Sequence, residues 1–452
     1  MPERLSARET LALVTDDFTF TELPVSGSDV PPDGPLGWQG YDASRARAAE
    51  RTGEQESVVC GTGRVEGTRA VLIAFEFGFL GGSLGVRTGD RLEAAYAYAR
   101  EHRLPVVPLV ATGGSRMQEG MLALTQLQRV ARQSALTREA GLAQIAVLRD
   151  PTTGGGWATL GAGADVTLAL PGAQVGFAGS RVRPADADPA AYTAEAQFAA
   201  GAVDAVVPPG ELREVLGRWL RLLTCPSDAP APVPAPLGAP DLPATGWEAV
   251  SRARSPQRPR AVAYLDAYFT HRLPLSGDRC GGTDPGMLCG FGEREGRTIA
   301  YAAQDGTATR PAGYRTAIRL IRLADRLGIP VLTLVDTPGA ANDAEAERQG
   351  VGAAIADLFL TVAAARTPVT TLLIGEGGSG GALALASPGN TWATPDSYFS
   401  VIAPELAAAI LKRPETEIEA TAEQLLLRPQ DVVALGVIRP TSPSTFRDNR
   451  VD

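Results

Sequence analysis

The feature that most restricts the fold of this chain is an internal repeat with an offset of 225 residues. The repeated pairs are Leu104–Val107 with Ile329–Leu332, Thr112–Gly114 with Thr337–Gly339, and Gly155 with Gly380. Self-similarity at a fixed spacing indicates that one structural design occurs twice. The 452 residues also exceed the roughly 100 to 200 that one hydrophobic core usually supports. We therefore predict two domains of one design.

A proline-rich segment marks the boundary between the halves. Pro226–Pro243 contains seven prolines in eighteen positions, a composition that favours extended polyproline geometry over a packed core. The predicted organisation is a partly disordered N-terminal extension (1–33), a first domain (34–225), a Pro/Ala-rich linker (226–245), a second domain (246–442) and a tail (443–452).

Each half has the pattern of an α/β fold. A segment with helical spacing of apolar residues precedes a continuously apolar strand, as expected for parallel strands covered on both faces. A second strand then leads into a glycine cluster and a helix of small residues, which together make β-turn-α units. These predicted segments are Arg91–Arg103, Val106–Val110 and Ala143–Leu148 in the first half, and Tyr314–Leu327, Val331–Val335 and Thr370–Ile374 in the second.

Two glycine clusters, Thr153–Gly156 and Gly375–Gly381, stand where a strand is expected to turn into a helix. The first N–H groups of a helix have no partner within it, and the helix dipole favours negative charge. Because glycine has no Cβ, a substrate oxygen can approach these N–H groups and its developing charge is stabilised, as in an oxyanion hole. The turns Thr112–Gly114 and Asp336–Gly339 reach the same sheet edges. Each half is therefore predicted to hold one oxyanion.

The glycine clusters are also compatible with a purely structural role. Glycines permit tight turns and close packing of a helix on a sheet. A phosphate loop is disfavoured, because neither G-x-x-x-x-G-K-[ST] nor a strand-linked G-x-G-x-x-G is present. Carboxylates near the turns are candidates for acid–base chemistry, although helix capping or solvation is their expected role. They are Glu119, Asp150, Asp336, Glu376 and Glu405.

Composition disfavours several classes of function. A net charge of −9 argues against nucleic acid or an anionic membrane as partner, since both require a clustered cationic surface. No apolar run approaches the ~20 residues that cross a bilayer, and the polar N-terminus lacks a signal-peptide core, so a cytoplasmic location is expected. Two histidines and four scattered cysteines without a C-x-x-C pair disfavour a histidine-centred triad and a metal site.

Several motifs resemble the carboxyltransferase of bacterial acetyl-CoA carboxylase. Strings similar to its β subunit are FLGGSLG (79–85), TGGSRMQEG (112–120), DPTTGGG (150–156) and GFAGSRV (176–182). Strings similar to its α subunit are PAGYRTAIRLIRLADR (311–326), VDTPGA (335–340), IGEGGSGGALAL (374–385) and YFSVIAPE (398–405). The likeness spans residues 34–440 in order. It implies two tandem crotonase-like (ClpP/crotonase) domains of the ββα-superhelix type.

The resemblance also implies a biotin-dependent reaction. In this family the first half binds an acyl-CoA thioester and the second binds carboxybiotin. Release of CO2 leaves a biotin anion that removes the α-proton of the acyl group, and the enolate captures CO2, so acetyl-CoA or a similar acyl-CoA gives malonyl-CoA or its homologue. Biotin carboxylase and a biotin carboxyl carrier protein are the implied partners. The family's site lies between two protomers, which implies at least a homodimer.

The family's functional positions fall on the glycine turns of this sequence. The implied oxyanion donors are Gly154 and Gly155 in one hole and Gly380 and Gly381 in the other, supported by Gly114 and Gly339. The implied contacts to the CoA thioester or to biotin are Gly113, Arg116, Gly377, Gly378 and Ser379. No metal ligand is implied.

The sequence departs from the family pattern at three places. No cysteine pair precedes Leu36, so the zinc ribbon is absent and no zinc is expected. The basic stretch before the GYR helix is shortened to Gln304–Arg310, and the loop after VDTPGA becomes Ala341–Glu345. Leu406 stands where the motif S-P-E-G would place glycine. A biotin-independent malonyl-thioester decarboxylase, which would use the same enolate stabilisation, and a non-catalytic scaffold remain alternatives.

Overall fold

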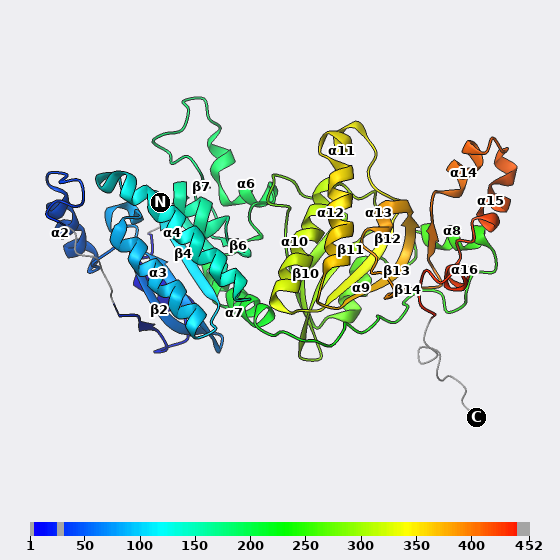
Figure 1. Cartoon of the computed structure of the whole chain (residues 1–452), viewed down its shortest axis with the longest axis horizontal. Coiled ribbons are helices and arrows are strands. Elements are labelled where there is room, and N and C mark those ends of the chain that lie inside the picture. The colour runs from blue at the N-terminus through cyan, green and yellow to red at the C-terminus, as the bar shows by residue number, and fades with distance from the viewer. Residues whose placement is uncertain (1–3, 25–30, 441–452) are drawn as a thin grey trace. The chain divides into compact units, whose positions relative to one another are not determined.

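The computed structural model describes residues 4–24 and 31–440, which form two compact units (Figure 1). The first unit comprises residues 1–224 with 279–281, and the second comprises residues 225–278 with 282–452. The tail predicted over residues 443–452 lies outside the described residues, as do positions 1–3 and 25–30 of the predicted extension. Within the described ranges, no helix is long and apolar enough to span a membrane.

An eight-stranded sheet forms the centre of the first unit. Its strands are β1 (Thr21–Glu22), β2 (Val58–Val65), β3 (Thr68–Phe75), β4 (Val106–Thr112), β5 (Ile145–Thr153), β6 (Val166–Ala169), β7 (Val175–Gly176) and β8 (Ala205–Val206). Their order is β1-β2-β3-β4-β5-β6-β8, and β7 pairs with the end of β5. β2 and β3 form an antiparallel hairpin, whereas β3 to β6 run parallel. The carboxyl ends of β4 and β5 are therefore neighbours.

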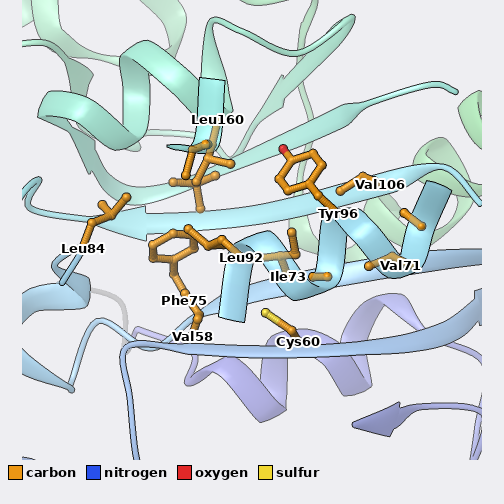
Figure 2. Packing of buried hydrophobic residues seen from close by; sticks show 14 of the residues in the cluster. Val58, Cys60, Val71, Ile73, Phe75, Leu84, Leu92, Tyr96, Val106 and Leu160 are labelled. Carbon is orange, nitrogen blue, oxygen red and sulfur yellow. The ribbon is translucent and has the colours of Figure 1, made fainter. Parts of the chain in front are cut away.

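Helices cover both faces of this sheet. They are α1 (Ala7–Val14), α2 (Tyr41–Thr52), α3 (Val86–Glu101), α4 (Gly120–Glu139), α5 (Gly154–Gly156), α6 (Ala194–Ala199) and α7 (Leu212–Leu223), with short turns η1 (Leu80–Gly82), η2 (Met117–Glu119), η3 (Trp157–Gly161), η4 (Pro189–Tyr192) and η5 (Pro209–Glu211). Leu92 and Tyr96 of α3 pack on Ile73, Val106 and their neighbours in one apolar cluster (Figure 2). α1 and α7 contact each other and also pack on β2 and β3.

The N-terminal helix α1 was not predicted. Ser6 and Glu9 form a capping box at its start. Ala7, Leu11 and Val14 are at most 3% exposed. Helix α1, within the predicted extension, is therefore packed against the rest of the first unit.

The second unit repeats the design around a seven-stranded sheet. Its strands are β9 (His271–Pro274), β10 (Met287–Arg294), β11 (Arg297–Gln304), β12 (Val331–Thr337), β13 (Val369–Gly378), β14 (Thr391–Ala393) and β15 (Tyr398–Ser400). Its helices are α8 (Gly246–Arg254), α9 (Ala261–Tyr268), α10 (Pro311–Leu327), α11 (Ala344–Arg348), α12 (Val351–Ala364), α13 (Ser379–Leu383), α14 (Pro404–Ile410), α15 (Ile418–Gln424) and α16 (Pro429–Ala434), with one further turn, η6 (Glu415–Glu417). The sheet order is β14-β13-β12-β11-β10-β9, and β15 pairs with β13.

The two sheets share one topology. An antiparallel hairpin, β2–β3 or β10–β11, is followed by parallel strands, and a short strand pairs beyond the bulged end of β5 or β13. In both halves the register shifts just before Thr112 or Thr337. The prediction of two α/β domains of one design is confirmed.

The proline-rich segment contains no helix or strand and packs on the second unit. The Tyr268 hydroxyl donates to the Pro232 carbonyl at 2.8 Å, and the Thr370 hydroxyl donates to the Ala231 carbonyl at 2.9 Å. Ala231 is 3% exposed. Side chains of the second unit therefore satisfy backbone groups of this segment.

Candidate active site

In the first unit, two glycine turns meet at the carboxyl ends of β4 and β5. Thr112 pairs with Thr152, so Gly113–Gly114 and the start of α5 lie side by side. Gly114 has φ 108° and Gly154 has φ 61°, conformations that favour glycine. A Cβ built on Gly154 would lie 3.2 Å from the Cα of Gly114. Both the backbone conformation and the close approach of the two turns therefore favour glycine at position 154.

The N–H groups of this first-unit turn are not equally available. The Gly154 N–H donates to the Phe177 carbonyl at 3.0 Å, and the Gly113 N–H donates to the Gly81 carbonyl at 2.9 Å. The Gly155 N–H has no backbone acceptor among residues 4–24 and 31–440. The Gly114 N–H donates only within its own turn, to Thr112 Oγ1 at 3.0 Å. Of these four N–H groups, that of Gly155 has no acceptor among the described residues, and that of Gly114 bonds only to a side chain of its own turn.

The second unit reproduces this backbone. Thr337 pairs with Gly377, and the Gly339 N–H donates to Thr337 Oγ1 at 3.1 Å. Ser379 has φ 58°, so it is the conformational counterpart of Gly154. Gly380 then corresponds to Gly155, and its N–H likewise lacks a backbone acceptor in the described part of the chain.

Gly381, which was also predicted to be an oxyanion donor, lies in a tighter environment than Gly380. It corresponds to Gly156 and is buried. Its carbonyl accepts hydrogen bonds from the Tyr314 hydroxyl at 3.1 Å and from Gln304 Nε2 at 3.3 Å. A Cβ on Gly381 would lie 2.4 Å from the Ala340 nitrogen, whereas a Cβ on Gly380 would have no neighbour within 4 Å. Gly381 therefore permits packing, and Gly380 faces open space.

Gly377 and Gly378 allow close packing around the same turn. A Cβ on Gly377 would lie 2.0 Å from Phe399 Cδ2, and one on Gly378 would lie 1.9 Å from the Pro338 carbonyl oxygen. These glycines let β13 lie against β15 and against the turn after β12. They shape the site, while Ser379, whose side chain is exposed, borders it.

Arg116, predicted to contact cofactor or substrate, lies in a buried ion-pair network instead. Its side chain is 1% exposed and donates to Glu56 Oε1 at 2.5 Å and to Glu56 Oε2 at 3.1 Å. Burial acts to raise the pKa of Glu56, but the Arg116 guanidinium outweighs it and holds that pKa below its ordinary value. The Tyr41 hydroxyl donates to Glu119 in the same cluster at 2.5 Å. A guanidinium so enclosed is not a contact for a bound ligand.

Two of the carboxylates expected to be caps or solvated are buried. Glu119 is 3% exposed, and Asp336 is fully buried with Arg258 donating to both of its oxygens at 2.6 and 2.7 Å. Glu119 pairs with Tyr41 and Asp336 with Arg258, and because these partners are distant in the sequence, no local pattern predicts the pairings. Asp150 binds Arg4, while Glu376 and Glu405 share Arg254, at 2.8 and 2.5 Å respectively.

Two further features lie near the second-unit turn. An apolar cavity of ≈ 380 Å³ is lined by Leu383 at the end of α13 and the following Ala384, by Phe399 of β15 and by Phe359 of α12, among others. Leu406 on α14 is 58% exposed, so within this chain its branched side chain faces solvent rather than filling a pocket. No disulfide joins cysteines in the described ranges, which also hold no cluster of His, Cys, Asp and Glu suited to a metal ion.

Both halves match known carboxyltransferase families. Residues 37–206 match the family described as "Carboxyl transferase domain", and residues 243–443 match "Acetyl co-enzyme A carboxylase carboxyltransferase-like". The chain is 39% identical over 469 residues to the "Acetyl-coenzyme A carboxylase carboxyl transferase subunits beta/alpha" of Salinispora arenicola, covering 97% of this chain and 82% of that protein. It is 35% identical to a "Probable biotin-dependent acyl-coenzyme A carboxylase beta3 subunit" of Mycobacterium bovis, covering 89% and 83%.

Solved structures of carboxyltransferases have the same fold. A transcarboxylase 12S structure with methylmalonyl-coenzyme A bound superposes with a TM-score of 0.77 at 19% identity, covering 98% of this chain and 88% of that one. A single-chain, multi-domain long-chain acyl-CoA carboxylase gives a TM-score of 0.74 at 19% identity, covering 98% of this chain and 46% of that one. Both units are thus crotonase-like domains in tandem. On sequence, fold and paired glycine turns, this chain belongs to the fused beta/alpha acetyl-CoA carboxylase carboxyl transferase family and is a biotin-dependent carboxyltransferase.

Proposed function

We propose that this protein transfers the carboxyl group from carboxybiotin on a biotin carboxyl carrier protein to acetyl-CoA or another short acyl-CoA, giving malonyl-CoA or its homologue. The observation that supports this most is the pair of matched turns, in which Gly155 and Gly380 occupy the same backbone position and each keep an N–H that no described residue accepts. A reaction with two carbonyl oxygens that gain negative charge has use for two such donors.

We assign the first-unit turn to the thioester and the second-unit turn to biotin, following the family. The Gly155 N–H, assisted by Gly114, would donate to the thioester oxygen as the enolate forms. The Gly380 N–H, assisted by Gly339, would donate to the ureido oxygen, and the space beside Gly380 suits a ring carbonyl because no atom lies within 4 Å of a Cβ built there. Carboxybiotin, when bound, supplies the carboxyl group.

No side-chain base is assigned. Glu119 and Asp336 are held in buried ion pairs, and Glu376 is bound by Arg254 and by the Tyr398 hydroxyl. Arginine or tyrosine donors already occupy oxygens of these carboxylates, so we assign none of them to accept the α-proton of the substrate. The chain's role is to bind, orient and stabilise charge through its backbone. We further propose that the two halves of one site come from different protomers, which requires at least a homodimer.

The reverse half-reaction tests this proposal. Purified protein is incubated with malonyl-CoA with and without biocytin, and CO2 release and acetyl-CoA formation are measured. Biotin-dependent turnover is expected. Release of CO2 without biocytin would identify a decarboxylase instead. Turnover with methylmalonyl-CoA but not with malonyl-CoA would overturn the acetyl-CoA assignment and keep the carboxyltransferase reaction.

A further inference from the structure

The first-unit turn takes its shape from a neighbouring loop. The Gly113 N–H donates to the Gly81 carbonyl, the Leu84 N–H donates to the Gly114 carbonyl, and the Arg116 N–H donates to the Leu84 carbonyl, each at 2.9 Å. A Cβ on Gly82 would lie 2.1 Å from the Ala111 carbonyl oxygen, so loop and strand are in close contact. The position of the Gly113–Gly114 turn therefore depends on where this loop, Phe79–Gly85, is held.

Arg116 holds the loop from the buried side. Its guanidinium donates to the Ser83 carbonyl at 2.7 Å and to Ser83 Oγ at 3.2 Å. The same group is fixed by both oxygens of Glu56, whose side chain is also 1% exposed. Only arginine presents enough N–H groups in one rigid plane to reach the loop and the carboxylate together.

A second chain of contacts connects Arg116 to α2 and α3. Arg116 donates to the Tyr41 hydroxyl at 3.1 Å, and that hydroxyl donates to Glu119 Oε1. Glu119 Oε2 in turn accepts from the N–H of Val86, the first residue of α3, at 2.5 Å. The cluster thus links the loop, the turn and two helix starts through charged groups buried together.

We infer that Arg116 is a positioning residue for the carboxyl-transfer reaction: it holds loop Phe79–Gly85 so that the Gly113–Gly114 turn stays in place against Gly154 and beside the Gly155 N–H that faces the reacting oxygen. This inference rests on the proposed function of the first-unit turn. Arg116 acts through the loop and touches no substrate. Its loss should consequently change the rate of the chemical step and leave the binding of the CoA portion intact.

The test compares Arg116→Lys with Arg129→Lys. Lysine keeps the positive charge but cannot reach Ser83 and Glu56 at once. Arg129 also binds two carboxylates of the first unit, Asp90 and Glu93, but it is 34% exposed and lies on the α3–α4 surface. Arg116→Lys is expected to lower kcat for malonyl-CoA-dependent carboxylation of biocytin about 10²-fold with little change in KM for malonyl-CoA, as for a misplaced catalytic group. Arg129→Lys should behave like the wild type.

Hydrogen exchange gives a readout that does not depend on activity. The amides of Leu84, Gly113 and Arg116 should exchange at least about tenfold faster in Arg116→Lys and not in Arg129→Lys, because opening of the loop is their route to exchange. If Arg116→Lys does not fold, Tyr41→Phe, which removes one oxygen from the cluster, replaces it in both measurements.

The outcomes separate the two hypotheses. An inactive wild-type protein would count against the proposed function. In that case hydrogen exchange alone still tests the positioning role, which unchanged amide protection in Arg116→Lys would overturn. With an active wild type, unchanged kcat in a folded Arg116→Lys protein refutes the inference, as does a rise in KM with kcat unaltered.

Discussion

Of the substitutions at the paired turns, Gly380→Ala is the one expected to lower activity without lowering the stability of the fold. A Cβ at Gly380 has no neighbour within 4 Å, and its φ lies outside the left-handed region. Alanine at such a position removes backbone freedom from the unfolded chain and is expected to stabilise the protein by about 0.4–1 kcal/mol. The methyl group would nonetheless occupy the space through which an oxygen approaches the Gly380 N–H.

The size of the catalytic effect follows from the loss of one preorganised donor. Removing a single oxyanion donor lowers the rate by about 10²–10³-fold, which corresponds to about 2.7–4 kcal/mol of transition-state stabilisation. Gly380→Ala should therefore lower kcat/KM for malonyl-CoA-dependent carboxylation of biocytin by about 10²-fold. Its thermal midpoint should stay unchanged or rise by about 2 °C.

Gly352→Ala is the matched control. Gly352 lies in α12 of the same unit, also has no neighbour within 4 Å of a built Cβ, and is exposed. It should gain the same stability without losing activity. The reasoning is refuted if Gly380→Ala keeps kcat/KM within about threefold of the wild type, because one lost donor is worth far more than that, or if Gly352→Ala loses as much activity.

Three further predictions concern the first unit. A Cβ on Gly155 would lie 2.3 Å from Leu127 Cδ2, so Gly155→Ala should lower both the stability and the activity of the protein. Adding Leu127→Ala relieves this contact, so the double variant should have a different denaturant midpoint from Gly155→Ala but should not regain turnover. Gly154→Ala places a side chain at φ 61° and should lower the free energy of unfolding by about 1–2 kcal/mol in urea titrations. Arg116 holds the pKa of Glu56 below its ordinary value, so ionised Glu56 stabilises the fold above about pH 4.3, and this contribution is lost as the pH falls through the lower native pKa. Glu56→Gln should be less stable near neutral pH and should lose less stability on acidification than the wild type; parallel curves of unfolding free energy against pH would contradict this.

The α/β design was predictable because it depends on local patterns. The apolar strands and helical repeats were found at their correct places, although several elements are longer than predicted. β5 continues to Thr153, past Leu148, because its polar end is buried by pairing with β7 and by the turn after β4. α1 was missed, yet Ser6 and Glu9 carry the S-x-x-E spacing of a capping box, which is a signal that the sequence contains.

The glycine turns could be identified from the sequence, but which of their N–H groups lack an acceptor could not. Whether an N–H is available depends on acceptors that lie far away in sequence: Phe177 for Gly154 and Gly81 for Gly113. Ser379 and Gly154 are equivalent because they have nearly the same φ, and the sequence does not show this equivalence because their side chains differ. The pairing of Arg116 with Glu56 spans 60 residues, so no local pattern shows that this arginine is buried rather than exposed to a ligand.

The two units hold the same turn geometry with different supports, and this difference bears on function. Arg116 braces the first-unit turn, and its repeat position in the second unit is the buried Ala341. The second turn is braced instead by Asp336, which binds Arg258 and accepts the Glu376 N–H at 3.1 Å, and whose own repeat position is the buried Ala111. If the turns were by-products of packing, a change of packing partners would be expected to change them. The hydrogen bonds from Gly114 to Thr112 and from Gly339 to Thr337 nevertheless measure 3.0 and 3.1 Å. The turn geometry itself is therefore what both halves preserve, as expected if each turn supports the neighbouring donor, Gly155 or Gly380.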